Sequence, residues 1–396
     1  MSTTKTITLS GDELGAHVPH GGTRRWLAGP GLPSDGALFG FEALRRGGGG
    51  PRRTADHVGD PARLPSDVRD LLVIGEVHAG GGGGGGGEDL GEWVLLDGAT
   101  GEVSSVPVLH DRPDLMERTP LAPSLKALVE CAEATGQLLD TRGQFAAHEG
   151  RYGAEAVAEA VQQLQSVFQH AMEGAAEVPL YWRITALIRP LARIAGPGTD
   201  LALDFPVRLL DEEFGPGGVM RFEDVDFPAT LTHEPTRRFL RDVGLPEDGG
   251  MFQLDTDIPL PTLTEHHEEE DPAGPLPPHA DHLIRLGYLI EDTDLVIDGT
   301  TGEVQAWSIP EASLSPLNTD VSTLAFTLWL LHRERELDDD QHNEMTTEAY
   351  EHLAATMTEV LRTVDPKAAP APSELPSAAD WRYWPEVFQD EAGGVL

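Results

Sequence analysis

The segment Thr23-Arg-Arg-Trp-Leu-Ala-Gly-Pro-Gly-Leu-Pro-Ser-Asp35 recurs in similar form later in the chain. The second copy, 213 residues later, reads Thr236-Arg-Arg-Phe-Leu-Arg-Asp-Val-Gly-Leu-Pro-Glu-Asp248. This copy is a short amphipathic stretch that begins at Thr236, a residue type that caps helix N-termini, and ends at Gly244, a type that ends helices. Each copy is therefore predicted to be a short helix followed by the start of a new segment.

Further matches follow in unbroken order along the chain. They pair Leu71–Gly75 with Leu283–Gly287, Trp93–Val103 with Asp294–Val304, Pro120-Leu121 with Pro316-Leu317, and Tyr181-Trp182 with Tyr383-Trp384. A helical stripe of Val157, Val161, Leu164 and Phe168 also matches one of Leu353, Met357, Val360 and Val364. Chance rarely produces so many collinear matches. We predict two homologous domains, a first repeat at 1–195 and a second repeat at 196–396, joined at Gly196-Pro-Gly-Thr199.

The repeating unit has the pattern of an α+β domain. Val94–Val103 and Leu295–Val304 are predicted hairpins, in which Asp-Gly supplies the positive φ of the turn. The stripe Val321, Leu324, Leu328 and Leu331 predicts a helix buried against a sheet. We expect a mostly antiparallel, twisted sheet packed with helices in each repeat. Eight consecutive glycines, Gly80–Gly87, interrupt only the first repeat and predict a loop insertion.

The charge is strongly acidic and unevenly distributed. The chain has 28 Lys+Arg against 67 Asp+Glu and a formal net charge of −39, of which residues 1–196 carry −8 and residues 197–396 carry −31. This balance argues against direct nucleic-acid binding and favours attraction of basic partners. Compositional bias remains an alternative, because three lysines stand beside 25 arginines, as in high-GC coding, and salt adaptation also enriches Asp and Glu.

The cysteine count and the apolar pattern predict a cytoplasmic protein. The one cysteine, Cys131, excludes an intrachain disulfide and a multi-Cys zinc site. Cys131 lies in an apolar helical stripe and aligns with Thr327 of the second repeat. This position predicts a small buried side chain. No apolar signal-peptide core and no membrane-spanning stretch are recognisable.

The common sequence motifs of enzymes and cofactor sites are absent. The sequence has no phosphate-binding loop, no His-Glu-x-x-His helix and no Gly-x-Ser-x-Gly elbow. His266-His267-Glu268-Glu-Glu270 and the pair His279 and His282 resemble metal ligands in residue type, but they lie in a Pro-rich region without fixed geometry and have no counterpart in the first repeat. We therefore predict neither catalysis nor a cofactor or metal.

Three blocks of the second repeat resemble a known family. The runs Pro228–Pro246, Leu295–Val304 and Pro316–Phe326 resemble successive blocks of the fourth family of the SUKH superfamily, from actinobacterial genomes. The first repeat is similar but has Ala122-Pro123 where the second has Asn318-Thr319. The resemblance implies two tandem SUKH-like domains in a non-enzymatic immunity protein of a polymorphic toxin–antitoxin system. Such a protein binds and neutralises a cognate toxin domain of the nuclease or nucleic-acid deaminase type.

A toxin that acts on nucleic acid has a basic cleft, which an acidic surface can occupy. The predicted partner-binding residues form two groups, in a loop at 265–271 and after the buried helix. They are Glu268, Glu269 and Glu270, and Glu334, Glu336, Asp338, Asp339 and Asp340. The first repeat could be a scaffold, a second toxin-binding module or a degenerate duplicate.

Two other functional classes stay open on sequence grounds. One is a cytosolic scaffold or regulatory protein with two such domains and no toxin partner. The other is an enzyme with an unrecognised site, which would require a deep polar pocket gathering residues such as Asp298, Glu303 and His282.

Overall fold

The computed structural model describes residues 5–34, 36, 38–42, 44, 50–78, 91–249, 251–256, 258–270, 275–290, 292–341, 345–370 and 383–392. The tract Gly80–Gly87 lies outside them. The chain divides into two compact units: unit 1 comprises Met1–Glu149, Ala158–Pro190 and Thr346–Thr356, and unit 2 comprises Gly150–Val157, Leu191–Met345 and Met357–Leu396. Unit 1 thus holds most of the first repeat and unit 2 most of the second. A domain boundary at 195/196 remains a prediction.

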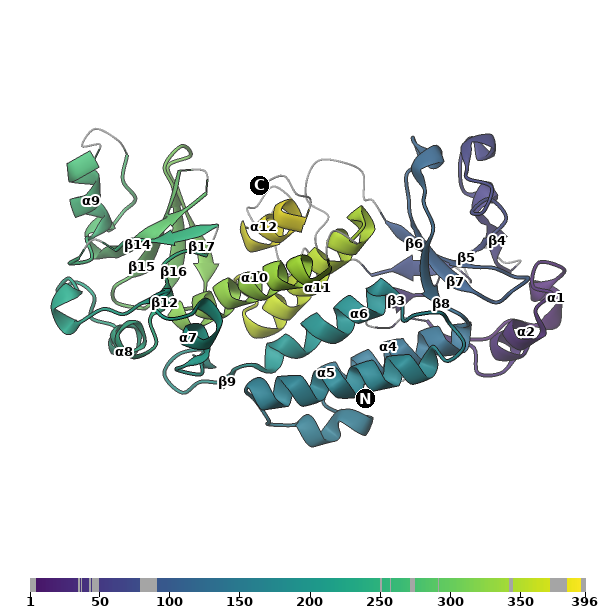
Figure 1. Cartoon of the computed structure of the whole chain (residues 1–396). Coiled ribbons are helices and arrows are strands. Elements are labelled where there is room, and N and C mark those ends of the chain that lie inside the picture. The colour runs from purple at the N-terminus through teal and green to yellow at the C-terminus, as the bar shows by residue number, and fades with distance from the viewer. Residues whose placement is uncertain are drawn as a thin grey trace. The chain divides into compact units, whose positions relative to one another are not determined.

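Two similar series of elements follow each other along the chain (Figure 1), with α1 and β4 found in the first alone and β9, β10, α7 and α9 in the second alone among the described residues. The first series is β1 (Thr6–Ile7), α1 (Gly11–Leu14), α2 (Gly21–Ala28), β2 (Leu32–Pro33), β3 (Phe39–Gly40), β4 (Arg52–Arg53), β5 (Leu72–Val77), β6 (Glu92–Leu96), β7 (Val103–Pro107), β8 (Thr119–Ala122), α4 (Leu125–Leu139), α5 (Ala154–Ala171) and α6 (Leu180–Ile188). The second is β9 (Gly196–Pro197), β10 (Leu203–Asp204), α7 (Leu209–Phe214), β11 (Val219–Met220), α8 (Glu234–Asp242), β12 (Leu245–Pro246), β13 (Phe252–Leu254), α9 (Leu263–Glu270), β14 (Leu283–Leu289), β15 (Thr293–Asp298), β16 (Val304–Ser308), β17 (Ser313–Asn318), α10 (Val321–Gln341), α11 (Thr347–Val364) and α12 (Tyr383–Ala392).

Each repeat contributes one large antiparallel sheet in addition to small two-stranded ones. The strand orders are β3-β5-β6-β7-β8, with β4 paired to β5, and β13-β14-β15-β16-β17. Both sheets carry the same register shift, between Val73 and Gly75 in one and between Arg285 and Gly287 in the other. A side chain at Gly75 or Gly287 would collide with a backbone carbonyl of the neighbouring edge strand. The α+β prediction is therefore confirmed, down to a shared irregularity of the backbone.

Both faces of each sheet are covered, because successive strand residues point to opposite sides. In unit 1, Ile74 and Val94 pack in one cluster with α4, and Val73 and Leu95 pack in a separate cluster on the other face. In unit 2, Leu263 of α9 covers the second face together with residues of three strands, namely Leu283, Val296 and Trp307. Figure 1 shows α9 and α10 on opposite sides of that sheet.

The two repeats differ in a buried polar network behind the sheet. In the second repeat, Trp384 donates its indole N–H to Asn318 Oδ1 at 2.9 Å, and Asn318 Nδ2 donates to Thr327 Oγ1 at 3.1 Å. In the first repeat, Trp182 donates to the backbone oxygen of Leu121 at 2.8 Å instead. There Cys131 replaces Thr327, and burial raises the pKa of its thiol to about 12. The first repeat thus keeps the Trp hydrogen bond without the side-chain network.

The structure corrects the predicted helix start and turn. The N-cap residues of α2 and α8 are His20 and His233 rather than the threonines. Each His Nδ1 lies 2.8 Å from the hydroxyl of the Thr three residues later. In the hairpin turns, positive φ occurs at Gly101 and Gly302, not in the Asp-Gly pairs. A side chain at either glycine would collide with the adjacent His ring, so the turn and the helix start are packed as one unit.

The Tyr-Trp matches lie at the start of an unpredicted helix, α6 or α12, which is the third helix after the sheet in each repeat. Trp182 and Trp384 are fully buried. The segment Gly196-Pro-Gly-Thr199, predicted to be a linker, belongs in part to the small hairpin β9–β10. No helix among the described residues is long and apolar enough to cross a membrane.

Candidate partner-binding surfaces

The predicted acidic segment 265–271 is not a loop where it is described. Residues 263–270 form α9, and Thr262 starts it with a capping box: Thr262 N donates to Glu265 Oε2 at 2.8 Å, and Glu265 N donates to Thr262 Oγ1 at 3.2 Å. Glu268 is exposed on this helix, as a partner-binding residue requires. The side chains of Glu269 and Glu270 and the position of Asp271 lie outside the described residues.

The second acidic group continues α10 instead of following it. The helix runs to Gln341 and includes Glu334, Glu336 and Asp338–Asp340. The expectation that Glu334 lies at the surface is wrong, because it is 5% exposed. It stands one helical turn after Leu330 and Leu331, on the face that the helix buries. The side chains of Glu336 and Asp338–Asp340 lie outside the described residues, so their role stays a prediction.

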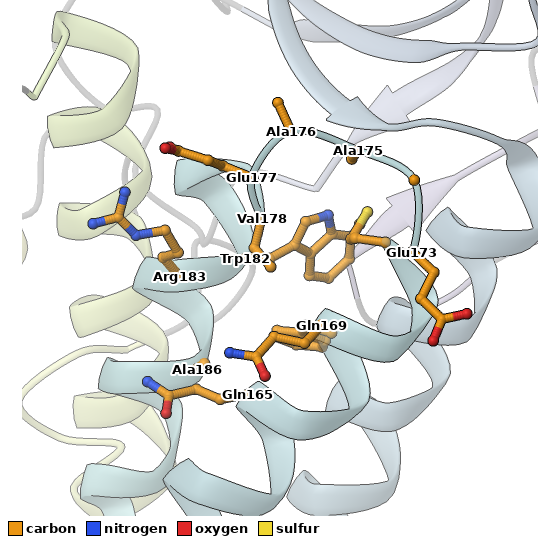
Figure 2. Close-up of a pocket in the computed structure, with 13 residues that line it drawn as sticks. Gln165, Gln169, Glu173, Ala175, Ala176, Glu177, Val178, Trp182, Arg183 and Ala186 are labelled. Atoms are coloured by element: carbon orange, nitrogen blue, oxygen red, sulfur yellow. The ribbon is translucent and has the colours of Figure 1, made fainter.

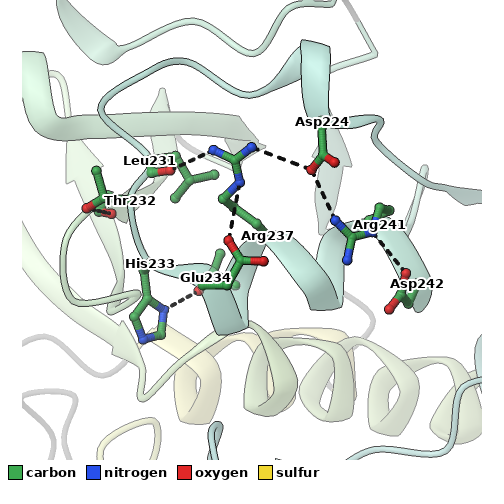
Figure 3. Close-up of polar contacts among 10 residues, drawn as sticks. Asp224, Leu231, Thr232, His233, Glu234, Arg237, Arg241 and Asp242 are labelled. Atoms are coloured by element: carbon green, nitrogen blue, oxygen red, sulfur yellow. Dashed lines mark hydrogen bonds and ion pairs between the residues drawn. The ribbon is translucent and has the colours of Figure 1, made fainter.

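The repeated Thr-Arg-Arg motif has a structural role in both repeats. Arg24 of α2 donates to the backbone oxygens of Gly15 at 2.7 Å and Val18 at 3.1 Å. Its counterpart Arg237 donates to the backbone oxygen of Leu231 at 3.3 Å (Figure 3). Each arginine therefore ties its helix to the segment that precedes it.

Helix α8 also carries a row of surface ion pairs (Figure 3). Arg237 lies 3.5 Å from Asp224 and 3.8 Å from Glu234, and Arg241 lies 3.1 Å from both Asp224 and Asp242. Exposed pairs of this kind stabilise a fold by only about 0–1 kcal/mol each. Their main effect is to balance the arginines, so α8 does not present a cationic surface.

Next to α8, unit 2 contains a cleft of about 330 Å³ with an acidic rim. The hairpin β9–β10 contributes the exposed Asp200 and Asp204, and α8 contributes the exposed Asp242. Arg238 of α8 also lines the cleft and pairs with Asp200 at 3.0 Å, so the carboxylates outnumber the cations there by three to one. The apolar part of the lining is Phe205, Phe239, Leu203, Leu201, Val243 and Val207, of which Val207 is 53% exposed. Carboxylates around apolar surface suit a Lys or Arg, whose stem is apolar and whose tip is cationic. We call this site the α8 cleft.

A second cavity, of about 670 Å³, lies in unit 1 between the end of α5 and the start of α6 (Figure 2). Its base is formed by the core residues Phe168, Met172 and Trp182. Polar groups of Gln165, Gln169, Glu173, Glu177 and Arg183 surround it. Its described lining contains no Ser, Thr, Cys or His, so it offers no nucleophile with an adjacent base.

Unit 1 also holds a buried cluster of titratable groups. The His352 and Tyr181 rings stack with centroids 3.8 Å apart, and His352 Nε2 lies 3.1 Å from Thr185 Oγ1. Burial, followed by the nearby Arg189 cation, lowers the pKa of His352 to about 3. Burial and the Glu92 carboxyl raise the pKa of Tyr181. Both rings are therefore neutral near pH 7, which fits a packed core better than acid–base catalysis.

This cluster predicts a loss of stability in mild acid. The pKa of His352 is lower in the folded than in the unfolded chain, so its contribution is present above about pH 6.5 and is lost as the pH falls toward 3. From pH 7.5 to pH 4.5 we expect the free energy of unfolding to fall by about 1–2 kcal/mol. This is less than the full pKa shift of His352 would give, because the His352 side chain keeps part of its surface in water. Urea unfolding of the full chain and of His352→Gln at both pH values measures it. An equal pH dependence in both proteins would contradict the assignment.

The residues proposed for an enzymatic alternative have structural partners. Asp298 accepts hydrogen bonds from Thr300 N and Thr301 N, both at 2.8 Å. Burial raises the pKa of Asp298, but the hydrogen bonds outweigh burial and hold the pKa below its usual range. Glu303 pairs with Lys367 at 2.9 Å. Within the described part of the chain, no three His, Cys, Asp or Glu side chains are grouped as metal ligands.

Comparison with protein families decides the identity of the fold. A family model described as SUKH-4 immunity protein matches residues 3–176 and again residues 205–390. The chain belongs to the SUKH-4 immunity protein family. No curated protein and no solved structure matches it. The two matched segments of the SUKH-4 chain cover the two series of structural elements except α6, β9 and β10, so the predicted tandem duplication is confirmed.

Membership in the SUKH-4 family gives the chain an immunity role with a cognate toxin as partner, and proteins of such families generally act by binding rather than by catalysis.

Sequence reasoning missed the α8 cleft, because its carboxylates come from two elements and stand singly between other residues. The capping-box pattern Thr262-Leu-Thr-Glu265 was the available signal for α9.

Proposed function

We propose that this SUKH-4 protein binds a toxin that acts on nucleic acid, of the nuclease or deaminase type, and neutralises it in the cytoplasm. The observation that carries the proposal is the match of both repeats to one immunity family. The protein acts as a stoichiometric partner without cofactor, metal or reaction of its own. It has no direct role in binding nucleic acid, which the charge of −39 disfavours.

The charge distribution supports a basic partner. Most of the negative charge lies in the second repeat, and the α8 cleft combines three exposed carboxylates with apolar surface. A basic toxin cleft would be attracted over long range and would place Lys or Arg side chains between these carboxylates. Tight binding further requires a desolvated apolar centre, for which Phe205, Phe239 and Val207 are the nearest residues.

The test of the function is rescue from toxicity. Candidate toxin genes next to the gene of this chain are expressed with the full chain or with an empty vector, and growth is measured. Rescue by the full chain, together with co-purification of the toxin, supports the proposal. A chain that binds other cytosolic proteins and rescues from none of the toxins would favour the scaffold or regulatory alternative.

Charge variants test the acidic surface. We expect Asp200→Asn, Asp204→Asn and Asp242→Asn together to weaken toxin binding about tenfold at low salt, mainly through slower association, and added salt to reduce this difference. The triple variant of Asp338, Asp339 and Asp340 to Asn tests the predicted α10 group in the same way. Surface plasmon resonance at several salt concentrations measures both effects.

The matched control changes three exposed carboxylates of unit 1: Asp67→Asn, Glu117→Gln and Glu149→Gln. It removes the same charge from the other unit and should change the association rate less than twofold. Binding that is insensitive to salt and to both second-repeat variants would contradict the acidic-surface model.

A further inference from the structure

Unit 1 contains a groove of about 1080 Å³ beside α4. Helix α4 forms one side with residues that include Glu133, Gly136 and Gln137. Thr6 of β1 and Pro33 of β2 contribute to the other side. We call this feature the α4 groove.

In unit 2 the corresponding place is filled by helix α7. This helix contacts β11, β12 and α10, which correspond to β1, β2 and α4 of the first repeat. The Phe214 ring of α7 packs on the His332 ring with centroids 4.4 Å apart, and Glu213 lies 3.4 Å from Arg333. The offset of 196 residues places Gly136 at the position of His332 and Gln137 at that of Arg333. The α4 groove therefore corresponds to the position that α7 occupies in unit 2. No described residue of unit 1 fills this position.

We propose that the α4 groove binds a short amphipathic helix of the toxin, with apolar residues on one face and a Lys or Arg beside them. The inference rests on the proposed function only in naming the toxin as the protein that carries this helix. Helix-in-groove binding of this kind places apolar anchors at helical spacing against an apolar floor. The groove supplies buried apolar residues at its base, among them Phe39 and Leu128, and Leu139 at its edge is 37% exposed.

The charges of the groove select a basic helix. Its charged lining residues are Glu130, Glu133, Asp140 and Arg142. Glu130 pairs with Lys126 at 3.5 Å and Asp140 with Arg142 at 3.0 Å. Glu133 is exposed and has no ion pair among the described residues. A cationic side chain would therefore find a free carboxylate, whereas the acidic α7 of a second copy of this chain would be repelled.

Gly136 allows the groove to be closed with little disturbance. It lies in the last turn of α4, and a Cβ there would meet nothing within 4 Å. Gly136→Trp should fill the groove, and Gly136→Ala is the matched control that leaves it open. Both replace a helical glycine, so neither should destabilise the helix.

The probe is a fluorescent peptide of residues 205–216 with Asp211→Lys, Glu212→Lys and Glu213→Lys, compared with the natural sequence. Fluorescence anisotropy with the full chain measures binding. We expect the Lys peptide to bind more tightly than the natural one, Gly136→Trp to weaken it at least about tenfold, and Gly136→Ala to change it less than twofold. Glu133→Lys should weaken the Lys peptide about tenfold.

Binding that Gly136→Trp leaves unchanged, or equal binding of the two peptides, would overturn the inference. A dimer of the wild-type chain that Gly136→Trp dissociates, seen by analytical ultracentrifugation, would assign the groove to a second copy instead. If Gly136→Trp fails to fold, as judged by circular dichroism, the Glu133→Lys variant decides the result.

Growth rescue separates this inference from the proposed function. Loss of rescue with Gly136→Trp and retention with Gly136→Ala supports toxin binding in the groove. Full rescue by both variants overturns it while the immunity function stands. Absence of rescue by the wild-type chain overturns the proposed function, and the peptide experiment still judges the groove.

Discussion

Replacing Arg285 by Ala should lower the free energy of unfolding by about 3–5 kcal/mol, because it leaves the buried Asp294 carboxylate of the sheet without its counter-charge. Arg285 lies 2.5 Å from Asp255 and 2.8 Å from Asp294, and its side chain is 9% exposed. The Asp294 side chain is 7% exposed, so water cannot replace the lost partner. Urea unfolding of the full chain at pH 7 measures the effect.

The duplicated repeat supplies the control for this prediction. The positions of Arg285 and Asp294 are occupied by Val73 and Trp93 in the first repeat, where the same sheet face is apolar. The double variant Arg285→Met with Asp294→Leu should therefore recover most of the stability lost in Arg285→Ala, since removing a buried ion pair together with its charge is often neutral. Asp255, at 16% side-chain exposure, keeps access to water. A double variant less stable than Arg285→Ala would contradict this account.

Replacing Trp384 by Ala should lower the free energy of unfolding by about 3–5 kcal/mol, comparable to other truncations of a buried aromatic residue. Trp384 has no exposed surface, and its indole N–H is hydrogen-bonded to Asn318. The loss combines an emptied core position with an amide oxygen left without its donor. Urea unfolding, together with near-UV circular dichroism of the aromatic residues, measures it.

Phenylalanine variants separate the two contributions. Trp384→Phe keeps most of the apolar volume but removes the donor to Asn318, and Trp182→Phe does the same to the Leu121 carbonyl. In the second repeat the Asn318 side chain stays tied to Asp365, with Nδ2 at 3.3 Å from Oδ2, so the amide cannot turn to find another donor. We expect each variant to lose about 1–3 kcal/mol. If Trp384→Phe lost as much stability as Trp384→Ala, the packing of the indole ring, and not its hydrogen bond, would account for the contribution of Trp384.

Most of the fold could be predicted from repeated local patterns. The alternating segments of the predicted hairpins lie in strands, as expected. The apolar stripes Val321–Leu331 and Leu353–Val364 lie in the helices α10 and α11, also as expected. Helices α6 and α12 escaped prediction, because a buried helix of about ten residues has little periodicity to detect. Glu334 escaped for a different reason: a charged residue predicts a solvated face, yet the helix continues past Leu331 and carries it inward.

The candidate sites were harder to predict than the fold. The acidic runs at 268–270 and 338–340 are visible in sequence, whereas the α8 cleft gathers Asp200, Asp204 and Asp242 from a hairpin and a helix. Single carboxylates spread over some forty residues give no local signal. Only the pairing of β9 with β10 and the packing of α8 bring them to one rim.

The sequence alone determined that the chain is a duplication of one α+β unit and that its charge lies mainly in the second repeat. These properties follow from residue order and composition, which need no coordinates. Only the tertiary structure decided that α7 fills a place in unit 2 that stays a groove in unit 1. It also decided that Arg285 and Asp294, which stand at the positions of Val73 and Trp93, form an ion pair. Such differences depend on which side chains meet across the fold, and local sequence patterns carry no information about that.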